Sequence, residues 1–182
     1  MSLKLLLRRW IWLVVAALVS FAVLYWLDQK LKADTGFGTV DLQGLPTGLD
    51  YKRIFAAWID RPHAAAAGFN LGFDYLFMLL YGTAFYYSAI VAREAFAPKR
   101  GTLRRVLSYL AIVPVLGAVA DAAENAFQFW MLNTGATDAF ADAAARATGV
   151  KDVCFIVGLL LLAAAVPGYV KLVRPVKEQT SD

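Results

Sequence analysis

Four polar side chains recur at helical spacing inside an otherwise apolar stretch of this sequence. They stand at positions i, i+3, i+4 and i+7 and therefore share one face of a helix: Asp121, Glu124, Asn125 and Gln128. The apolar stretch is a candidate membrane span, and a charged side chain inside such a span costs about 2.5–3.5 kcal/mol on insertion scales. Two carboxylates one turn apart also repel each other. The stripe must therefore face a bundle interior or a polar cavity, with at least one carboxyl group protonated or paired with a cation.

Polar residues beside two other apolar runs are expected to meet this stripe. Asp74 precedes the run 75–92, Tyr81 follows it by two turns, and Lys151 precedes the run 153–170. Successive spans cross the membrane in opposite directions. The start of the second span, the later half of the third span (which contains the stripe) and the start of the fourth span therefore lie at the same depth. Arg61 and His63, just ahead of the second span, are expected to reach the same region. The candidate ligand-binding residues are thus Asp74, Tyr81, Asp121, Glu124, Asn125, Gln128, Lys151, Arg61 and His63.

Three interpretations of this set remain open. In the leading one, the residues form an outward-facing polar pocket for a lipid or small amphiphile. Lys151, and Arg61 if it reaches, would meet an anionic headgroup, while Asp121 and Glu124 accept hydrogen bonds or act as an acid–base pair. In the alternative, the cluster only ties the helices together in a non-catalytic accessory or structural subunit. A small transporter or a proton or cation pathway is third, because no matching polar residues continue toward the inner face.

Metal and cofactor chemistry finds little support in the sequence. The oxygen atoms of Asp74, Asp121, Glu124 and Asn125 could in principle hold magnesium or calcium, but their spacing does not require it. A single histidine and a single cysteine, Cys154, exclude multi-histidine and cysteine-based centres. The sequence contains no P-loop, dinucleotide fingerprint, G-x-S-x-G or H-E-x-x-H motif. We therefore predict no metal site and no cofactor, assign no catalytic residue, and favour a protein that is not an enzyme.

The elements that must position these residues are membrane helices. The 182-residue chain is 60% hydrophobic and 18% charged, whereas a soluble domain averages roughly 45–50% apolar and about 25% charged residues. The runs 10–27, 75–92 and 153–170 contain no charge and are long enough to cross a hydrocarbon core of about 30 Å. The stripe lies in a fourth run, 106–132. We predict a single all-α membrane domain, a bundle of four transmembrane helices spanning about 10–27, 72–93, 105–131 and 151–171.

Lysine and arginine in the flanks predict the orientation. The loop 28–70 carries five basic and five acidic residues, and the loop 133–150 has one base, Arg146, so both are predicted outside. Both termini are then cytoplasmic, the first span is an uncleaved anchor, and the bacterial plasma (inner) membrane is the expected location. Membrane lipids are the expected partners, with a homo-oligomer or a membrane protein partner also open, and no nucleic acid is expected. The flanking bases are Lys4, Arg8 and Arg9, then Arg93, Lys99, Arg100, Arg104 and Arg105, then Lys171, Arg174 and Lys177.

The outer loops contain further helical patterns. Tyr51, Ile54, Phe55 and Trp58 recur at helical spacing and predict an amphipathic extracytoplasmic helix over about 48–60. This helix would lie on the membrane or over the mouth of the bundle, either simply packed there or as a lid over a ligand site. The alanine-rich segment in 133–150 predicts a short helix leading into the fourth span.

Several short motifs resemble those of a known group of proteins. The chain resembles small, uncharacterised bacterial four-span membrane proteins, and the resemblance extends over most of its length. It implies a four-span membrane fold and brings no known activity. The residues that carry it are Asp41-Leu42-Gln43, Asp74 with Phe77 and Tyr81, Pro114, Asp121-Ala122-Ala123-Glu124-Asn125, and Lys151.

Overall fold

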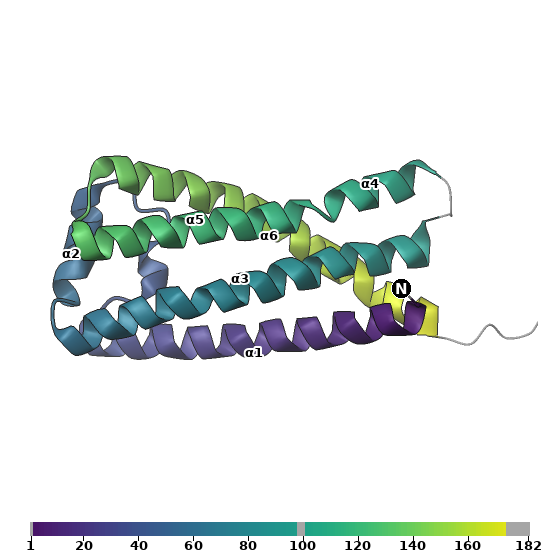
Figure 1. Ribbon diagram of the computed structural model, residues 1–182, viewed down its shortest axis with the longest axis horizontal. Helices are drawn as coiled ribbons and strands as arrows, with labels where there is room; N and C mark the ends of the chain where they lie inside the picture. Colours follow the sequence, from purple (N-terminus) through teal and green to yellow (C-terminus); the bar gives the residue numbers. More distant parts are fainter. Residues whose placement is uncertain (1, 98–100, 174–182) are drawn as a thin grey trace, which may run out of the picture.

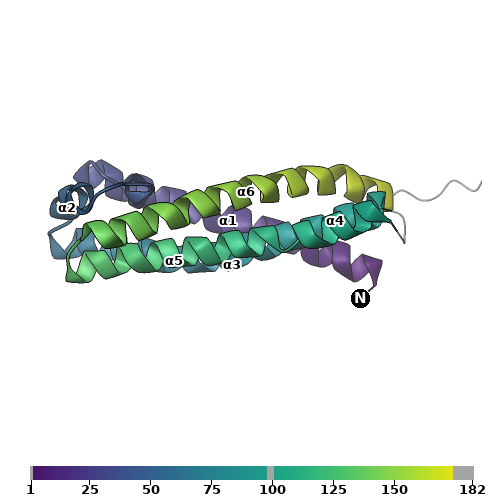
Figure 2. The same ribbon diagram turned by 90° about the horizontal axis from the view of Figure 1, so that it is seen from above.

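The computed structural model describes residues 2–97 and 101–173, and these form an elongated bundle of helices without a β-strand (Figure 1). Two short elements, the 3-10 helix η1 and helix α2, lie together at one end, which we call the α2 end (Figures 1 and 2). In chain order the elements are α1 (Leu3–Thr35), η1 (Thr39–Leu42), α2 (Gly48–Ala57), α3 (Arg61–Phe96), α4 (Thr102–Leu110), α5 (Val113–Thr134) and α6 (Asp138–Val173).

Four stretches of this bundle are long and apolar enough to cross a membrane: α1, α3, α4 with α5, and α6. The prediction of an all-α bundle with four such helices is confirmed. Helix α3 lies at the centre, because it packs against α1, α5 and α6 and is the most buried of the four. Gly117 allows close packing of α5 on α6, since a Cβ atom there would lie 2.6 Å from the Cβ of Cys154.

The helices extend well beyond the apolar runs. Helix α1 continues to Thr35 and ends at Gly36, whose φ of +86° suits a glycine C-cap. Helix α3 begins at Arg61, with Pro62 in its first turn, and α6 begins at Asp138. The predicted loops 28–70 and 133–150 are therefore largely helical, and the short helix expected in 133–150 is continuous with the fourth span. Hydropathy marks only the part of a helix that suits lipid, whereas packing at the α2 end extends these helices further.

The third span is interrupted rather than continuous over 105–131. Helix α4 ends at Leu110 and α5 begins at Val113, just before Pro114. Proline has no N–H to donate, and its ring would clash with the carbonyl four residues earlier, which explains the interruption. Helix α4 is tied to α3 by hydrogen bonds from Arg93 to Ser108 (3.0 Å) and from Arg104 to Glu94 (2.8 Å).

Helix α2 closes one end of the bundle. The predicted apolar face is buried at Tyr51, Ile54 and Trp58, which form a core with residues of α5 and α6 such as Met131 and Ala141. The side chain of Thr47 caps the helix, and the Gly48 N–H donates to Asp138 Oδ1 of α6 at 2.8 Å. Burial of this face against protein favours the packed arrangement over a helix lying on lipid.

The basic flanks that lie in the described part of the chain gather at the end opposite α2. Figure 1 shows the start of α1, helix α4 and the end of α6 together at that end. Lys99, Arg100, Arg174 and Lys177, which also entered the orientation prediction, lie outside the described residues. The flanking basic residues that the structure describes at this end are Lys4, Arg8, Arg9, Arg93, Arg104, Arg105 and Lys171.

Candidate functional site

A buried lysine joins the two carboxylates of the polar stripe. The Lys151 ammonium of α6 lies 2.6 Å from Glu124 Oε2 and 3.4 Å from Asp121 Oδ1, both on α5. All three residues are buried, with Glu124 fully inaccessible to solvent. One cation thus neutralises part of the charge that the stripe brings into the bundle, as the spacing of the two carboxylates requires.

Neutral side chains satisfy the remaining oxygen atoms of this pair. The Tyr81 hydroxyl of α3 donates to Asp121 Oδ2 at 3.0 Å, and Gln128 Nε2 donates to Glu124 Oε1 at 2.9 Å. We call Asp121, Glu124 and Lys151, with these two donors, the ion-pair cluster. It links α3, α5 and α6 at one level of the bundle.

A third carboxyl group, that of Asp74, lies beside the ion-pair cluster without a cation of its own. Asn125 Nδ2 of α5 donates to Asp74 Oδ2 at 2.9 Å and to the Leu71 carbonyl oxygen at 3.3 Å, both on α3. Among the residues that the structure describes, no lysine, arginine or histidine forms an ion pair with Asp74. Its carboxyl group therefore relies on one neutral amide.

A fourth carboxyl group, that of Asp28, comes from α1 and was not among the predicted residues. Asp28 Oδ1 accepts hydrogen bonds from Thr39 Oγ1 (3.1 Å) and the Val40 N–H (3.0 Å), and Asn70 Nδ2 donates to Thr39 Oγ1 (2.8 Å). Asp28 is buried, and a Cβ atom at Gly38 would overlap its carboxylate. In the sequence Asp28 only ends the first apolar run, and nothing in its spacing relates it to Thr39 or Asn70.

The η1 segment is fastened to α1 at a second point. Lys32 Nζ lies 2.9 Å from Asp41 Oδ1, and the Gly38 N–H donates to Asp41 Oδ2 at 2.8 Å. Partial burial raises the pKa of Asp41. The hydrogen bonds from Lys32 and Gly38 together lower it by more than burial raises it, so the net pKa lies below the ordinary value. Asp41 thus stays ionised and holds η1 against α1 down to acidic pH.

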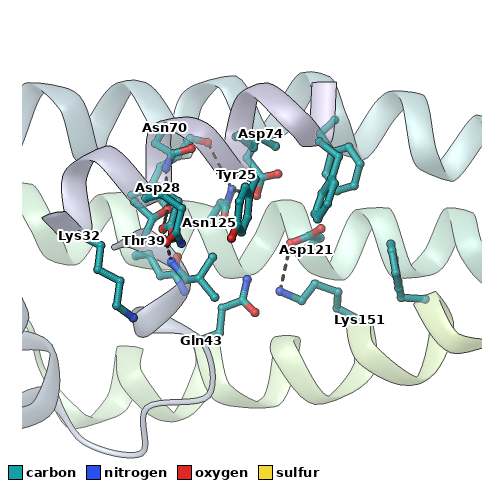
Figure 3. A pocket seen from close by; sticks show the side chains of 18 of the residues that line it. Tyr25, Asp28, Lys32, Thr39, Gln43, Asn70, Asp74, Asp121, Asn125 and Lys151 are labelled. Carbon is teal, nitrogen blue, oxygen red and sulfur yellow. Dashed lines mark hydrogen bonds and ion pairs between the residues drawn. The ribbon is translucent and has the colours of Figure 1, made fainter. Parts of the chain in front are cut away.

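These groups surround a cavity of about 430 Å³ among α1, α3, α5, α6 and η1 (Figure 3). Its walls combine carboxylates, amides and aromatic rings. The lining residues are Asp28, Asp74, Asp121 and Asp152; Lys32 and Lys151; Gln29, Gln43, Asn70, Asn125, Gln128 and Thr39; Phe21, Tyr25, Phe77 and Phe155; and Leu24, Val40 and Leu71.

Seven of the nine predicted residues come together around this cavity. Five of them line it, and Tyr81 and Glu124 bond to the lining residues Asp121 and Lys151. Arg61 and His63 do not line it, contrary to expectation: they begin α3 about 16–20 Å along the axis from Asp74, given the rise of a helix. They were expected close to the cluster because α3 was predicted to begin only near residue 72.

The charges of the ion-pair cluster are satisfied within the chain itself. Lys151 already has two carboxylate partners, so its charge is not available to an anionic headgroup. In the described part of the chain, no group of three or more histidine, cysteine, aspartate or glutamate side chains could hold a metal ion. No protein family, curated protein or solved structure matches this chain.

Proposed function

We propose that this multi-pass membrane protein binds a lipid or another small amphiphile in the cavity at the α2 end. The observation that supports this most directly is the mixed lining of the cavity, in which aromatic and aliphatic side chains stand beside a small number of charged and amide groups. Ligand pockets are concave and mostly apolar, with a few polar groups that orient the ligand. A molecule with both a polar headgroup and an apolar chain complements such a cavity.

The polarity changes in the same direction along three helices. Phe21 of α1, Phe77 of α3 and Phe155 of α6 each lie about one to two turns farther from the α2 end than the nearest lining charge on the same helix. These charges are Asp28, Asp74 and Asp152. The headgroup would therefore lie under η1 and the chain would point toward the middle of the bundle.

We further propose that the cavity opens toward the outside of the bacterial plasma membrane, with both termini in the cytoplasm. The basic flanks lie at the opposite end of the bundle from α2, and short basic flanks remain on the cytoplasmic side of a membrane. Membrane lipids then have access to the cavity from the outer leaflet.

A non-catalytic accessory or structural subunit is the second candidate. It is favoured by the ion-pair cluster, in which Lys151 is fully engaged with residues of its own chain. In this case the polar groups stabilise the bundle, and the function of the protein lies in a contact with another membrane protein.

Native mass spectrometry of the protein in lipid nanodiscs distinguishes the two candidates. Val40 lines the cavity and is 57% exposed, so Val40→Trp narrows the cavity without disturbing the ion-pair cluster. Leu49→Trp on α2 is the matched control, because Leu49 is 74% exposed and does not line the cavity. We expect one adduct of defined mass on the wild type and on Leu49→Trp, and its loss from Val40→Trp.

Two outcomes would contradict the proposal. One is a folded wild-type protein that carries no adduct, which the structural subunit predicts. The other is an adduct that Val40→Trp retains, because the ligand would then lie outside this cavity.

A further inference from the structure

We propose that the cavity selects an amphiphile whose headgroup is an organic ammonium ion, primary or quaternary, and that the carboxylate of Asp74 faces it. This inference rests on the proposed function and specifies its ligand class. It replaces the expectation that Lys151 meets an anionic headgroup.

Negative charge around the cavity exceeds the positive charge available to balance it. Four aspartates and two lysines line the cavity, and both lysines are already engaged. Lys32 is paired with Asp41, and Lys151 with Glu124 and Asp121. An anionic headgroup would therefore meet uncompensated carboxylates, whereas a cationic one would be attracted by them.

Asp74 is the shielded carboxylate that gains most from a cation, because Asp152, which also lines the cavity, is exposed to solvent and Asp28 has more hydrogen bonds. Asp28 accepts hydrogen bonds from the hydroxyl of Thr39, the N–H of Val40 and the amide of Gln29. Asp74 accepts one, from Asn125, and within the described chain no donor contacts its Oδ1. A carboxylate at the edge of a low-dielectric cavity is costly unless a positive partner neutralises it. A bound ammonium ion would supply that partner.

The walls of the cavity favour an organic cation over a metal ion. Phe21, Tyr25 and Phe77 line it, and the rings of Phe21 and Phe77 lie 5.7 Å apart. Aromatic faces attract ammonium ions and are the usual means of recognising quaternary ones. A hard metal ion needs six or more oxygen ligands or waters, and within the described chain no group of three or more histidine, cysteine, aspartate or glutamate side chains could hold one.

The test compares three probes in nanodiscs made of phosphatidylglycerol, a lipid without an amine. The probes are dodecyltrimethylammonium, laurate with a similar chain and an anionic headgroup, and tetramethylammonium without a chain. Binding is measured by native mass spectrometry as the amount of probe is raised. Asp74→Asn removes the charge and keeps an oxygen atom for Asn125, and Asp34→Asn, at an exposed position outside the cavity, is the matched control.

We expect the wild type and Asp34→Asn to bind dodecyltrimethylammonium at one site. Asp74→Asn should bind it at least about tenfold more weakly, because the quaternary headgroup has no N–H to donate and is held by its charge attraction to the carboxylate. Tenfold tighter binding of the long-chain cation than of tetramethylammonium identifies an amphiphile. Equal binding of the two cations would support the ammonium site but show that its ligand needs no alkyl chain. The proposed binding of an amphiphile would then be wrong.

Preferential binding of laurate that Val40→Trp abolishes would overturn the ammonium inference and leave the amphiphile pocket standing. Undiminished binding of dodecyltrimethylammonium to Asp74→Asn would also overturn it. If Asp74→Asn does not fold, Tyr25→Leu serves instead, since Tyr25 is 58% exposed at the cavity wall. Loss of its ring must weaken binding of the cation and leave laurate unaffected, and any other result contradicts the inference.

Discussion

At the scale of single residues, the ion-pair cluster explains how three ionisable side chains remain inside a membrane bundle. Lys151 contacts both carboxylates of the stripe, and Tyr81 and Gln128 donate to the oxygen atoms on their other sides. Removing one member of a buried charge group leaves its partners uncompensated, which costs far more than replacing the whole group by neutral residues.

We therefore expect Lys151→Gln to lower the free energy of unfolding by about 3–5 kcal/mol. The triple variant Asp121→Asn, Glu124→Gln, Lys151→Gln should recover most of this loss, because amides keep the shape and remove the charges. Denaturant titration of the purified protein in mild detergent, followed by circular dichroism, measures both.

The matched control is Arg146→Gln, which breaks the exposed pair with Asp142 on the same helix. An exposed pair contributes about 0–1 kcal/mol, so this variant should unfold almost like the wild type. If Lys151→Gln were as mild as Arg146→Gln, the cluster would not stabilise the bundle.

At the scale of elements, η1 rather than α2 covers the cavity. Thr39 and Val40 bond to Asp28 of α1, Asp41 pairs with Lys32, and Asn70 of α3 donates to Thr39. Helix α2 packs on the end of the bundle through Tyr51 and does not line the cavity. Of the two expectations for the helix over about 48–60, packing on the bundle agrees with this arrangement, and the segment that covers the cavity is the short one before α2.

We expect Gly38→Ala to loosen η1 without unfolding the bundle. An added Cβ atom would overlap the Asp28 carboxylate, so either this side chain or the segment must shift. Either shift weakens the hydrogen bonds of Asp28 with Thr39 and Val40. Hydrogen–deuterium exchange should become faster at residues 38–43, while α3, α5 and α6 keep their protection.

Gly72→Ala is the control for this change, because a Cβ atom there meets open space and alanine favours helix. Unchanged exchange at residues 38–43 in Gly38→Ala would show that η1 does not depend on its close contact with Asp28.

At the scale of the whole molecule, the bundle is asymmetric along its length. One end carries α2, η1 and the cavity, and the other carries the basic ends of α1 and α6 together with α4 (Figures 1 and 2). This asymmetry connects the proposed ligand site with one side of the membrane.

Single-cysteine labelling measures which side that is. Cys154 is the only cysteine of the chain and is buried, so Cys154→Ala gives a background without thiols. In this background we expect Leu49→Cys on α2 to react with a membrane-impermeant maleimide in intact cells. Leu103→Cys on α4 should react only after permeabilisation.

Both positions are exposed on the protein surface, so a difference in labelling reports sidedness rather than burial. The reverse pattern would place the cavity in the cytoplasmic half of the membrane and contradict the proposed access from the outer leaflet.

The sequence by itself determined the features that depend on neighbours along the chain. Charge-free runs long enough to cross a membrane predict the four spans, and the i, i+3, i+4, i+7 spacing of Asp121 to Gln128 predicts one buried polar face. The need to neutralise that face pointed to Lys151. The apolar face of α2 follows from the same periodicity.

Only the tertiary structure decided which groups meet across the bundle. Asp28 and Asn70 join the cavity because a turn after α1 returns η1 to them, and no local pattern encodes that contact. Arg61 and His63 fall outside it because α3 begins earlier than hydropathy indicates. The charge balance of the cavity also follows from packing, since pairing with Asp41 and Glu124 uses up the lysines and leaves Asp74 without a cation. Spacing along a helix is local, whereas the partner of a charge depends on how distant segments pack.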